Sequence, residues 1–247
     1  MIVLRSALFA LCMVVVTPIY AVVATLTFPF PPMVRYRVIS GWAKTMIALL
    51  RLLCRTDYRV LGVENVPAGA AVIASKHQSA WETLAFQCIF PPQVWVLKRE
   101  LLRIPFFGWG LAMLSPIAIN RRDGRGALKE IAAQGVDRLR RGFWVVIFPE
   151  GTRMLPGTRG KYGIGAAHLA IHAGVPVVPV AHNAGEFWGK NGFLKRPGTV
   201  TVSIGPPIDP NGVSASELTR RIEAWIEAEV SRLPHAKAAG RPQPQVP

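Results

Sequence analysis

The stretch from Ser6 to Val34 contains no charged residue, and this constrains the fold more than any other feature of the chain. Its core, ALFALCMVVVTPIYAVVATLTF, would as a helix be long enough to cross about 30 Å of hydrocarbon. Pro18 predicts a kink in that helix. The alternative is a cleaved signal peptide with Arg5 in its basic region. Because the run is long for a signal peptide and has no clean A-x-A site, we expect a membrane-associated helix.

A second apolar segment follows the break PFPP at 29–32. In RYRVISGWAKTMIALLRLLCR (35–55), Arg37, Lys44 and Arg51 recur every seven residues among mostly apolar neighbours. This pattern favours a basic amphipathic helix in a membrane interface. The alternative is an ordinary helix packed on a core. Together the two segments predict a membrane-anchoring helical hairpin over residues 1–56. Basic residues lie mostly after the apolar run, so we expect the remaining domain on the cytoplasmic side of the inner membrane.

The composition agrees with a membrane-bound protein. The 247 residues are 51% hydrophobic and 17% charged, with a net charge of +15. A chain that is both apolar and basic favours an anionic membrane surface as partner, and no recognised nucleic-acid-binding motif accompanies the charge. The cysteines at positions 12, 54 and 88 have no paired spacing, so they support neither a disulfide framework nor a zinc site.

From residue 57 to 233 the chain alternates short β-rich runs with helical patterns. This alternation predicts an α/β domain with a mixed, largely parallel sheet flanked by helices on both faces. We expect a disordered tail at 234–247, PHAKAAGRPQPQVP. The expected strands lie at 58–63, 71–75, 94–97, 116–119, 143–148, 175–181 and 199–205, and the expected helices at 80–89, 124–142, 162–173 and 214–233.

The segment SKHQSAWETLAF (75–86) joins an expected strand to an expected helix. Ser79 and Glu82 fit the capping box S-x-x-E, which explains Glu82 but leaves His77 unexplained. If the helix begins after Ser79, the Glu82 side chain leans back toward the loop that carries His77. Glu82 could then accept the imidazole Nδ1–H and leave Nε2 free as a base. Taken alone, a histidine and a glutamate at this spacing more often have a structural role than a catalytic one. A second motif is needed to distinguish the two roles.

The second motif is FPEGTR at 148–153, directly after the apolar run FWVVIF. Pro149 ends the expected strand, and Gly151 permits an unusual backbone. Free backbone N–H groups beside Arg153 predict an anion site. The alternative is an ordinary strand-end turn with an exposed arginine. More arginines follow in INRRDGR (119–125), and a basic pocket near a histidine base suits an anionic substrate that bears a hydroxyl.

In order along the chain, five segments resemble the motif blocks of the glycerolipid acyltransferases, and all of them lie within residues 76–180. Two positions depart from the family pattern, which usually has His-x4-Asp where this chain has Glu82, and often Asp-Arg where it has Asn120-Arg121. The segments are HQSAWE (77–82), IPFFG (104–108), INR (119–121), FPEGTR (148–153) and VPVVPV (175–180).

The resemblance implies an enzyme of phospholipid biosynthesis. It would transfer an acyl group from acyl-CoA or acyl carrier protein to the sn-2 hydroxyl of lysophosphatidate, 1-acyl-sn-glycerol-3-phosphate, giving phosphatidic acid without a cofactor or a metal. His77 would be the general base and Glu82 the carboxylate that orients it. Glu150 would order the FPEGTR loop or contact the glycerol. The phosphate would be bound by Arg153, by the backbone of Gly151 and Thr152, and by either Arg121 or Arg122.

Other functions fit the residues less well. The acceptor could be another lysolipid, such as lyso-ornithine lipid. A non-catalytic membrane-binding protein would leave the ordered motifs without a purpose. A serine hydrolase is disfavoured because the chain has no G-x-S-x-G motif. A metal triad of His168, His172 and His182 is disfavoured by its apolar surroundings. The segment IPFFGWGLAML (104–114) fits an acyl-chain groove and a plain core equally well.

Overall fold

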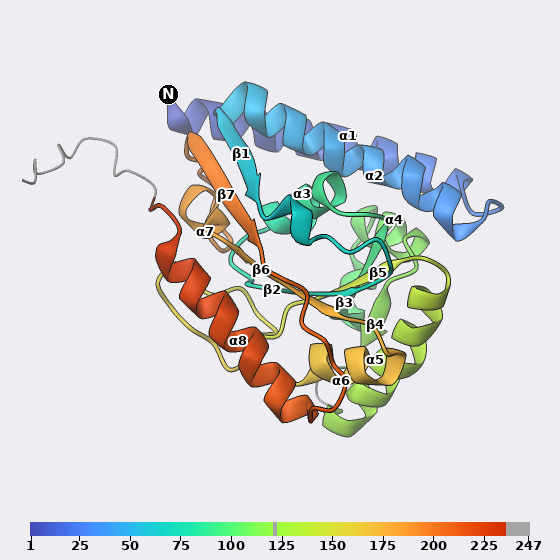
Figure 1. The fold of residues 1–247 in the computed structure, drawn as a ribbon. Helices are drawn as coiled ribbons and strands as arrows, with labels where there is room; N and C mark the ends of the chain where they lie inside the picture. Colours follow the sequence, from blue (N-terminus) through green and yellow to red (C-terminus); the bar gives the residue numbers. More distant parts are fainter. Residues whose placement is uncertain (121–122, 236–247) are drawn as a thin grey trace, which may run out of the picture.

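The computed structural model of the chain describes residues 1–120 and 123–235 (Figure 1). Within these residues the strands form one seven-stranded sheet in the order β1-β7-β6-β2-β5-β3-β4. Every neighbouring pair is parallel except β6 and β7, which confirms the predicted mixed, largely parallel sheet. The strands are β1 (Thr56–Leu61), β2 (Val72–Ser75), β3 (Gln93–Lys98), β4 (Ile117–Ile119), β5 (Trp144–Ile147), β6 (Val177–His182) and β7 (Gly198–Ile204).

The central strands are the apolar runs of the sequence. β2 and β5 are buried at every residue, as expected for strands covered on both faces. They lie side by side and run in the same direction. The carboxyl ends of parallel neighbours meet at one edge of the sheet, which is where open α/β sheets bind ligands. The segments after β2 and β5, which carry the two motifs, therefore leave the sheet at the same edge.

Helices cover both faces of the sheet. Figure 1 shows α1, α2 and α3 on one side, and α5, α6 and α8 on the other. The predicted helices are all present, with ends within three residues of the expected ones. The domain helices are α3 (Trp81–Ile89), α4 (Phe107–Met113), α5 (Gly124–Arg140), α6 (Gly165–Ala173), α7 (Ala184–Phe187) and α8 (Ala215–Arg232). Of the predicted tail, residues 236–247 lie outside the described residues, and the Pro234 carbonyl accepts a hydrogen bond from Asn183 Nδ2 at 2.6 Å.

The N-terminal segments form the expected hairpin. α1 (Ile2–Leu26) and α2 (Pro32–Leu49) lie side by side, and a π-helical turn at Leu50–Cys54 continues α2. Trp42 Nε1 donates a hydrogen bond to Thr17 Oγ1 at 3.2 Å. One face of α2 is buried and contacts α3. For that face the alternative of a core-packed helix is therefore correct.

α1 has two different faces. It is the one helix in the described part of the chain that is long and apolar enough to cross a membrane. Many of its large apolar side chains are exposed, among them Leu4, Leu11 and Val14. On the opposite face, Ser6 Oγ accepts a hydrogen bond from Lys195 N at 2.9 Å, and α1 also contacts α4. The helix therefore lies along the domain and leaves one apolar side uncovered.

Candidate active site

The two motifs meet at the shared edge of β2 and β5. The His77 ring stacks on the Phe148 ring, with centroids 3.9 Å apart and an interplanar angle of 14°. The backbones are also joined, since Met154 N donates a hydrogen bond to the His77 carbonyl at 2.7 Å. Residues 71 positions apart in the sequence are thus in direct contact, as the parallel strands predict.

His77 and Glu82 make the predicted contact. The distance from His77 Nδ1 to Glu82 Oε1 is 2.8 Å, so the extra methylene of a glutamate does not prevent it. Glu82 is fully buried, and the same oxygen accepts hydrogen bonds from Gln78 N at 2.9 Å and Ser79 N at 2.8 Å. These three donors fix the carboxylate beneath the imidazole.

The capping box is only half formed. Glu82 makes its half of the motif with Ser79 N. Ser79 Oγ, however, accepts its hydrogen bond from Trp81 N at 3.1 Å, because the helix begins one residue later than the motif requires, with Ala80 as N-cap. Glu82 therefore holds the loop and the histidine more than it caps the helix.

The electrostatic environment keeps Glu82 ionised. Burial by itself would raise the pKa of the Glu82 carboxyl. The His182 imidazole and the hydrogen bond from His77 outweigh burial, with a further contribution from the Ser79 N–H, so the pKa is lowered. An ionised Glu82 is an acceptor, so Nδ1 of His77 carries a proton, and in the neutral imidazole the lone pair is then on Nε2. That is the tautomer a general base requires.

His182 is a buried neighbour of this pair. Its Nε2–H donates to the Lys76 carbonyl at 2.8 Å, and its Nδ1 accepts from Ala184 N at 3.3 Å. Burial lowers the pKa of the His182 imidazole, while the Glu82 carboxylate opposes this lowering, and both ring nitrogens contact the backbone. Within residues 1–120 and 123–235, no group of three His, Cys, Asp or Glu side chains is placed to hold a metal ion.

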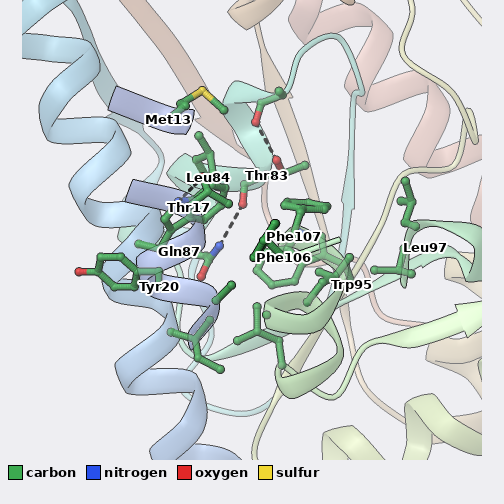
Figure 2. Close-up of a pocket in the computed structure, with 18 of the residues that line it drawn as sticks. Met13, Thr17, Tyr20, Thr83, Leu84, Gln87, Trp95, Leu97, Phe106 and Phe107 are labelled. Carbon is green, nitrogen blue, oxygen red and sulfur yellow. Dashed lines mark hydrogen bonds between the residues drawn. The ribbon is translucent and has the colours of Figure 1, made fainter. Parts of the chain in front are cut away.

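An apolar pocket of about 290 Å³ opens beside His77 (Figure 2). Its walls come from the hairpin, α3, β3 and α4, and include the Phe106 and Phe107 side chains. The segment at 104–114 therefore lines a cavity, which favours the groove over the plain core. His77, Lys98, Phe148 and Arg153 line the same cavity. A narrow apolar space with a base and cations at its wall fits a lipid with an anionic head.

The FPEGTR loop fits the predicted anion site only in part, because Gly151 N donates a hydrogen bond to the Phe148 carbonyl at 2.9 Å and is not the free donor that we predicted. Gly151 has φ +65°, the left-handed conformation that favours glycine, and Thr152 is exposed. Arg153 Nε is buried and has no hydrogen-bond partner among the residues the structure describes. A buried donor without a partner indicates a missing acceptor, and a guanidinium binds phosphate well. The arginines at 121 and 122 lie outside the described residues.

Glu150 lies beneath the site and not in the cavity wall. Its Oε1 accepts hydrogen bonds from Lys76 Nζ at 2.8 Å and Gly160 N at 3.0 Å. Its Oε2 accepts from His77 N at 3.3 Å. Both oxygens are occupied by protein, so these contacts fit a residue that orders the loop better than one that contacts glycerol.

Sequence analysis did not identify two lysines of the site, Lys76 and Lys98. Lys98 is the last residue of β3, which pairs with β5, so its position at the shared edge could have been inferred from the strand pattern. Lys76 is 1% exposed although it directly precedes His77. Lysine is almost never fully buried, and nothing in the local sequence indicated that this one is.

Comparisons with known proteins agree with this site. A family model described as Acyltransferase matches residues 57–183. The chain is 43% identical, over 98% of its length and 97% of the relative, to a protein of Pseudomonas aeruginosa named 1-acyl-sn-glycerol-3-phosphate acyltransferase. It is 31% identical, over 65% of its length and 59% of the relative, to the human 1-acyl-sn-glycerol-3-phosphate acyltransferase beta. The crystal structure of the 1-acyl-sn-glycerophosphate acyltransferase PlsC from Thermotoga maritima shares the fold, with a TM-score of 0.77, 24% identity and coverage of 94% of this chain and 95% of that one.

Proposed function

This chain belongs to the acyltransferase family, and from that premise we propose that it acylates the sn-2 hydroxyl of 1-acyl-sn-glycerol-3-phosphate. The donor would be acyl-CoA or acyl carrier protein, and the product phosphatidic acid. The observation that carries the proposal is that His77 and Arg153 line one apolar cavity. Membership of an enzyme family sets aside the non-catalytic alternative.

In the proposed reaction, His77 Nε2 takes the proton from the sn-2 hydroxyl. The resulting alkoxide attacks the thioester carbonyl and forms a tetrahedral intermediate. Its collapse forms the ester, and the thiolate leaves and takes the proton from the imidazolium. Glu82 holds the ring and stabilises its charged form. General-base catalysis of this type contributes about 10²–10⁴-fold. No acyl-enzyme and no cofactor is needed.

The acceptor would be held at its two ends. Arg153, aided by the backbone of Thr152, would bind the phosphate. Lys98 at the cavity wall and one of the arginines at 121 and 122 would add positive charge. The apolar cavity would take an acyl chain. This arrangement would place the sn-2 hydroxyl, which lies between phosphate and chain, beside the imidazole.

An acceptor panel tests the proposed substrate. Purified protein is given lysophosphatidate, lyso-ornithine lipid or a neutral lysolipid, each with acyl-CoA and with acylated carrier protein, and the products are identified by lipid mass spectrometry. We expect phosphatidic acid as the major product, because only lysophosphatidate offers a phosphate to Arg153. Rapid acylation of lyso-ornithine lipid without phosphatidic acid formation would favour the other lysolipid.

We also infer that the hairpin embeds the enzyme in the cytoplasmic leaflet of the inner membrane. Two contacts support this: Ser6 near the start of α1 is bound to Lys195, and α1 also packs against α4. Both favour a helix that lies along the domain over one that leaves it to cross the bilayer. Met13, Thr17 and Tyr20 of α1 line the cavity, so a lipid could enter from the membrane (Figure 2). The net charge of +15 favours an anionic surface.

Replacing Val14 and Val22 together with glutamate should weaken binding to anionic vesicles by about 100-fold or more, because each valine loses about 1.5–3 kcal/mol of apolar burial. Val14 is 70% exposed, so the change should cost little stability. Vesicle sedimentation measures the effect. Replacing Leu61 and Val63, two exposed apolar residues outside the hairpin, together with glutamate adds the same two charges and is the matched control. Equal vesicle binding by the Val14 and Val22 variant and by the control would rule out this membrane face.

A further inference from the structure

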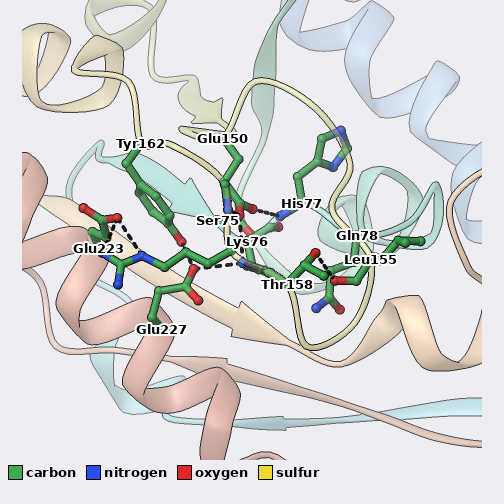
Figure 3. A network of polar contacts seen from close by, with 12 residues as sticks. Ser75, Lys76, His77, Gln78, Glu150, Leu155, Thr158, Tyr162, Glu223 and Glu227 are labelled. Carbon is green, nitrogen blue, oxygen red and sulfur yellow. Dashed lines mark hydrogen bonds and ion pairs between the residues drawn. The ribbon is translucent and has the colours of Figure 1, made fainter.

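Lys76 is a buried cation that the proposed reaction does not use. Its ammonium donates to Glu150 Oε1 at 2.8 Å, to Glu227 Oε1 at 2.8 Å and to the Thr158 carbonyl at 3.1 Å (Figure 3). All three ammonium hydrogens are therefore used. Lysine is rarely buried unless it is paired, and this one has two carboxylate partners.

The three partners bring together segments that are distant in the sequence. Lys76 follows β2, Glu150 belongs to the FPEGTR loop, and Glu227 is on α8, outside the residues 57–183 that the family model matches. Glu227 Oε1 also accepts from Tyr162 OH at 2.7 Å. α8 therefore contacts the loop of residues 148–164, which joins β5 to α6 and begins with the FPEGTR motif.

The same helix holds this loop at a second point. Glu223, one turn before Glu227, accepts two hydrogen bonds from the Arg159 guanidinium, at 3.0 and 2.6 Å. Arg159 is exposed, whereas the Lys76 ammonium is buried. Two carboxylates of α8 therefore bind the segment around this loop. Glu223 binds the exposed Arg159, and Glu227 binds the buried Lys76 ammonium.

The contacts of Lys76 continue to His77. Glu150, which Lys76 holds, accepts from the His77 N–H, and the His77 carbonyl accepts from Met154 N. The Lys76 carbonyl in turn accepts from His182. The peptide groups on both sides of His77 are therefore fixed to the loop that carries Arg153, and the Lys76 ammonium is at the centre of these contacts.

The buried ion pairs of Lys76 with Glu150 and Glu227 are not well explained by a gain in stability. Removing two charges from water offsets most of their attraction, and apolar residues of similar volume are often at least as stable. Geometry is a stronger reason, because a displacement of about 1 Å in a catalytic group can cost about 10²-fold in rate. One ammonium between two carboxylates fixes the relative position of three chain segments.

We propose that Lys76 is a positioning residue for acyl transfer, and that Glu227 of α8 acts through it. The buried ammonium holds the backbone of His77 against the loop that bears Arg153. This inference rests on the proposed role of His77 as base. It implies that α8, through Glu227, influences the rate of acyl transfer.

The test compares Glu227→Ala with Glu223→Ala, matched changes one turn apart on one helix. Glu227→Ala should lower kcat about tenfold or more and raise the KM for lysophosphatidate by a smaller factor, because the imidazole is displaced while Arg153 remains. Glu223→Ala should leave both near wild type. Glu227→Gln keeps an oxygen that accepts from Lys76 and Tyr162, so it should recover most of kcat. Lys76→Met should lower kcat about 100-fold.

All variants are assayed well below the lowest Tm of the set, with His77→Ala in parallel. Wild-type kcat in Glu227→Ala, or equal losses in the two alanine variants, would overturn the inference. If Lys76→Met does not fold, the two glutamate variants decide. Activity in His77→Ala would contradict the proposed base itself. An inactive His77→Ala beside fully active Glu227→Ala and Lys76→Met would remove only the positioning role.

Discussion

Replacing His77 with alanine should abolish measurable acyl transfer while leaving the protein folded and membrane-bound. Loss of the base should lower kcat by about 10²–10⁴-fold. The fold should persist because the side chain lies at the wall of an existing cavity. Glu82 would also keep its hydrogen bonds from Gln78 N and Ser79 N. Release of free thiol in the presence of lysophosphatidate measures the rate, and thermal unfolding checks the fold.

The matched control for this variant is His172→Ala. His172 is exposed on α6, and its Nδ1 lies 2.8 Å from the His168 carbonyl. Its replacement also removes one imidazole but should leave the rate at the wild-type level. Near-normal turnover in His77→Ala would exclude His77 as the base, whatever the control shows.

Replacing Arg153 with alanine should chiefly raise the KM for lysophosphatidate, by about 10–100-fold. A hydrogen bond to a charged group contributes about 1.5–3 kcal/mol, and tenfold in affinity corresponds to about 1.4 kcal/mol. kcat should change less, because the contact to the phosphate is made before and during the reaction alike. Initial rates over a range of lysophosphatidate concentrations at fixed donor separate the two constants.

Arg159→Ala is the control for Arg153→Ala. Arg159 lies in the same loop, but its guanidinium is bound to Glu223 on α8. Its loss should leave the KM for lysophosphatidate close to the wild-type value. An unchanged KM in Arg153→Ala, or an equal rise in both variants, would remove Arg153 from the phosphate site.

The parts of the fold that the sequence predicted are those set by local patterns. Short apolar runs such as WVVI of β5, bounded by turn residues, favour buried strands, and each predicted strand lies within two residues of its observed bounds. The contact of His77 with Glu82 was predictable for the same reason. It depends only on where one helix begins and on the backward lean of side chains in its first turn.

Features that depend on distant contacts were not predictable in this way. Lys76 and Glu227 are 151 positions apart, and nothing near either residue shows that the fold brings them together. The face of α2 that packs on α3 looks in sequence like a face suited to a membrane, because both environments select apolar side chains. The predicted start of α3 was one residue too early. The N-cap is Ala80 and not Ser79, and Ser79 Oγ accepts from Trp81 N.

The central claim is that one lysophosphatidate molecule contacts both Arg153 and His77. A structure of the wild-type enzyme with lysophosphatidate and without a thioester donor, in which no turnover can occur, tests it most directly. The account predicts the phosphate against Arg153 and the sn-2 oxygen within about 3 Å of His77 Nε2. A phosphate bound elsewhere, with the sn-2 oxygen turned away from the imidazole, would contradict it.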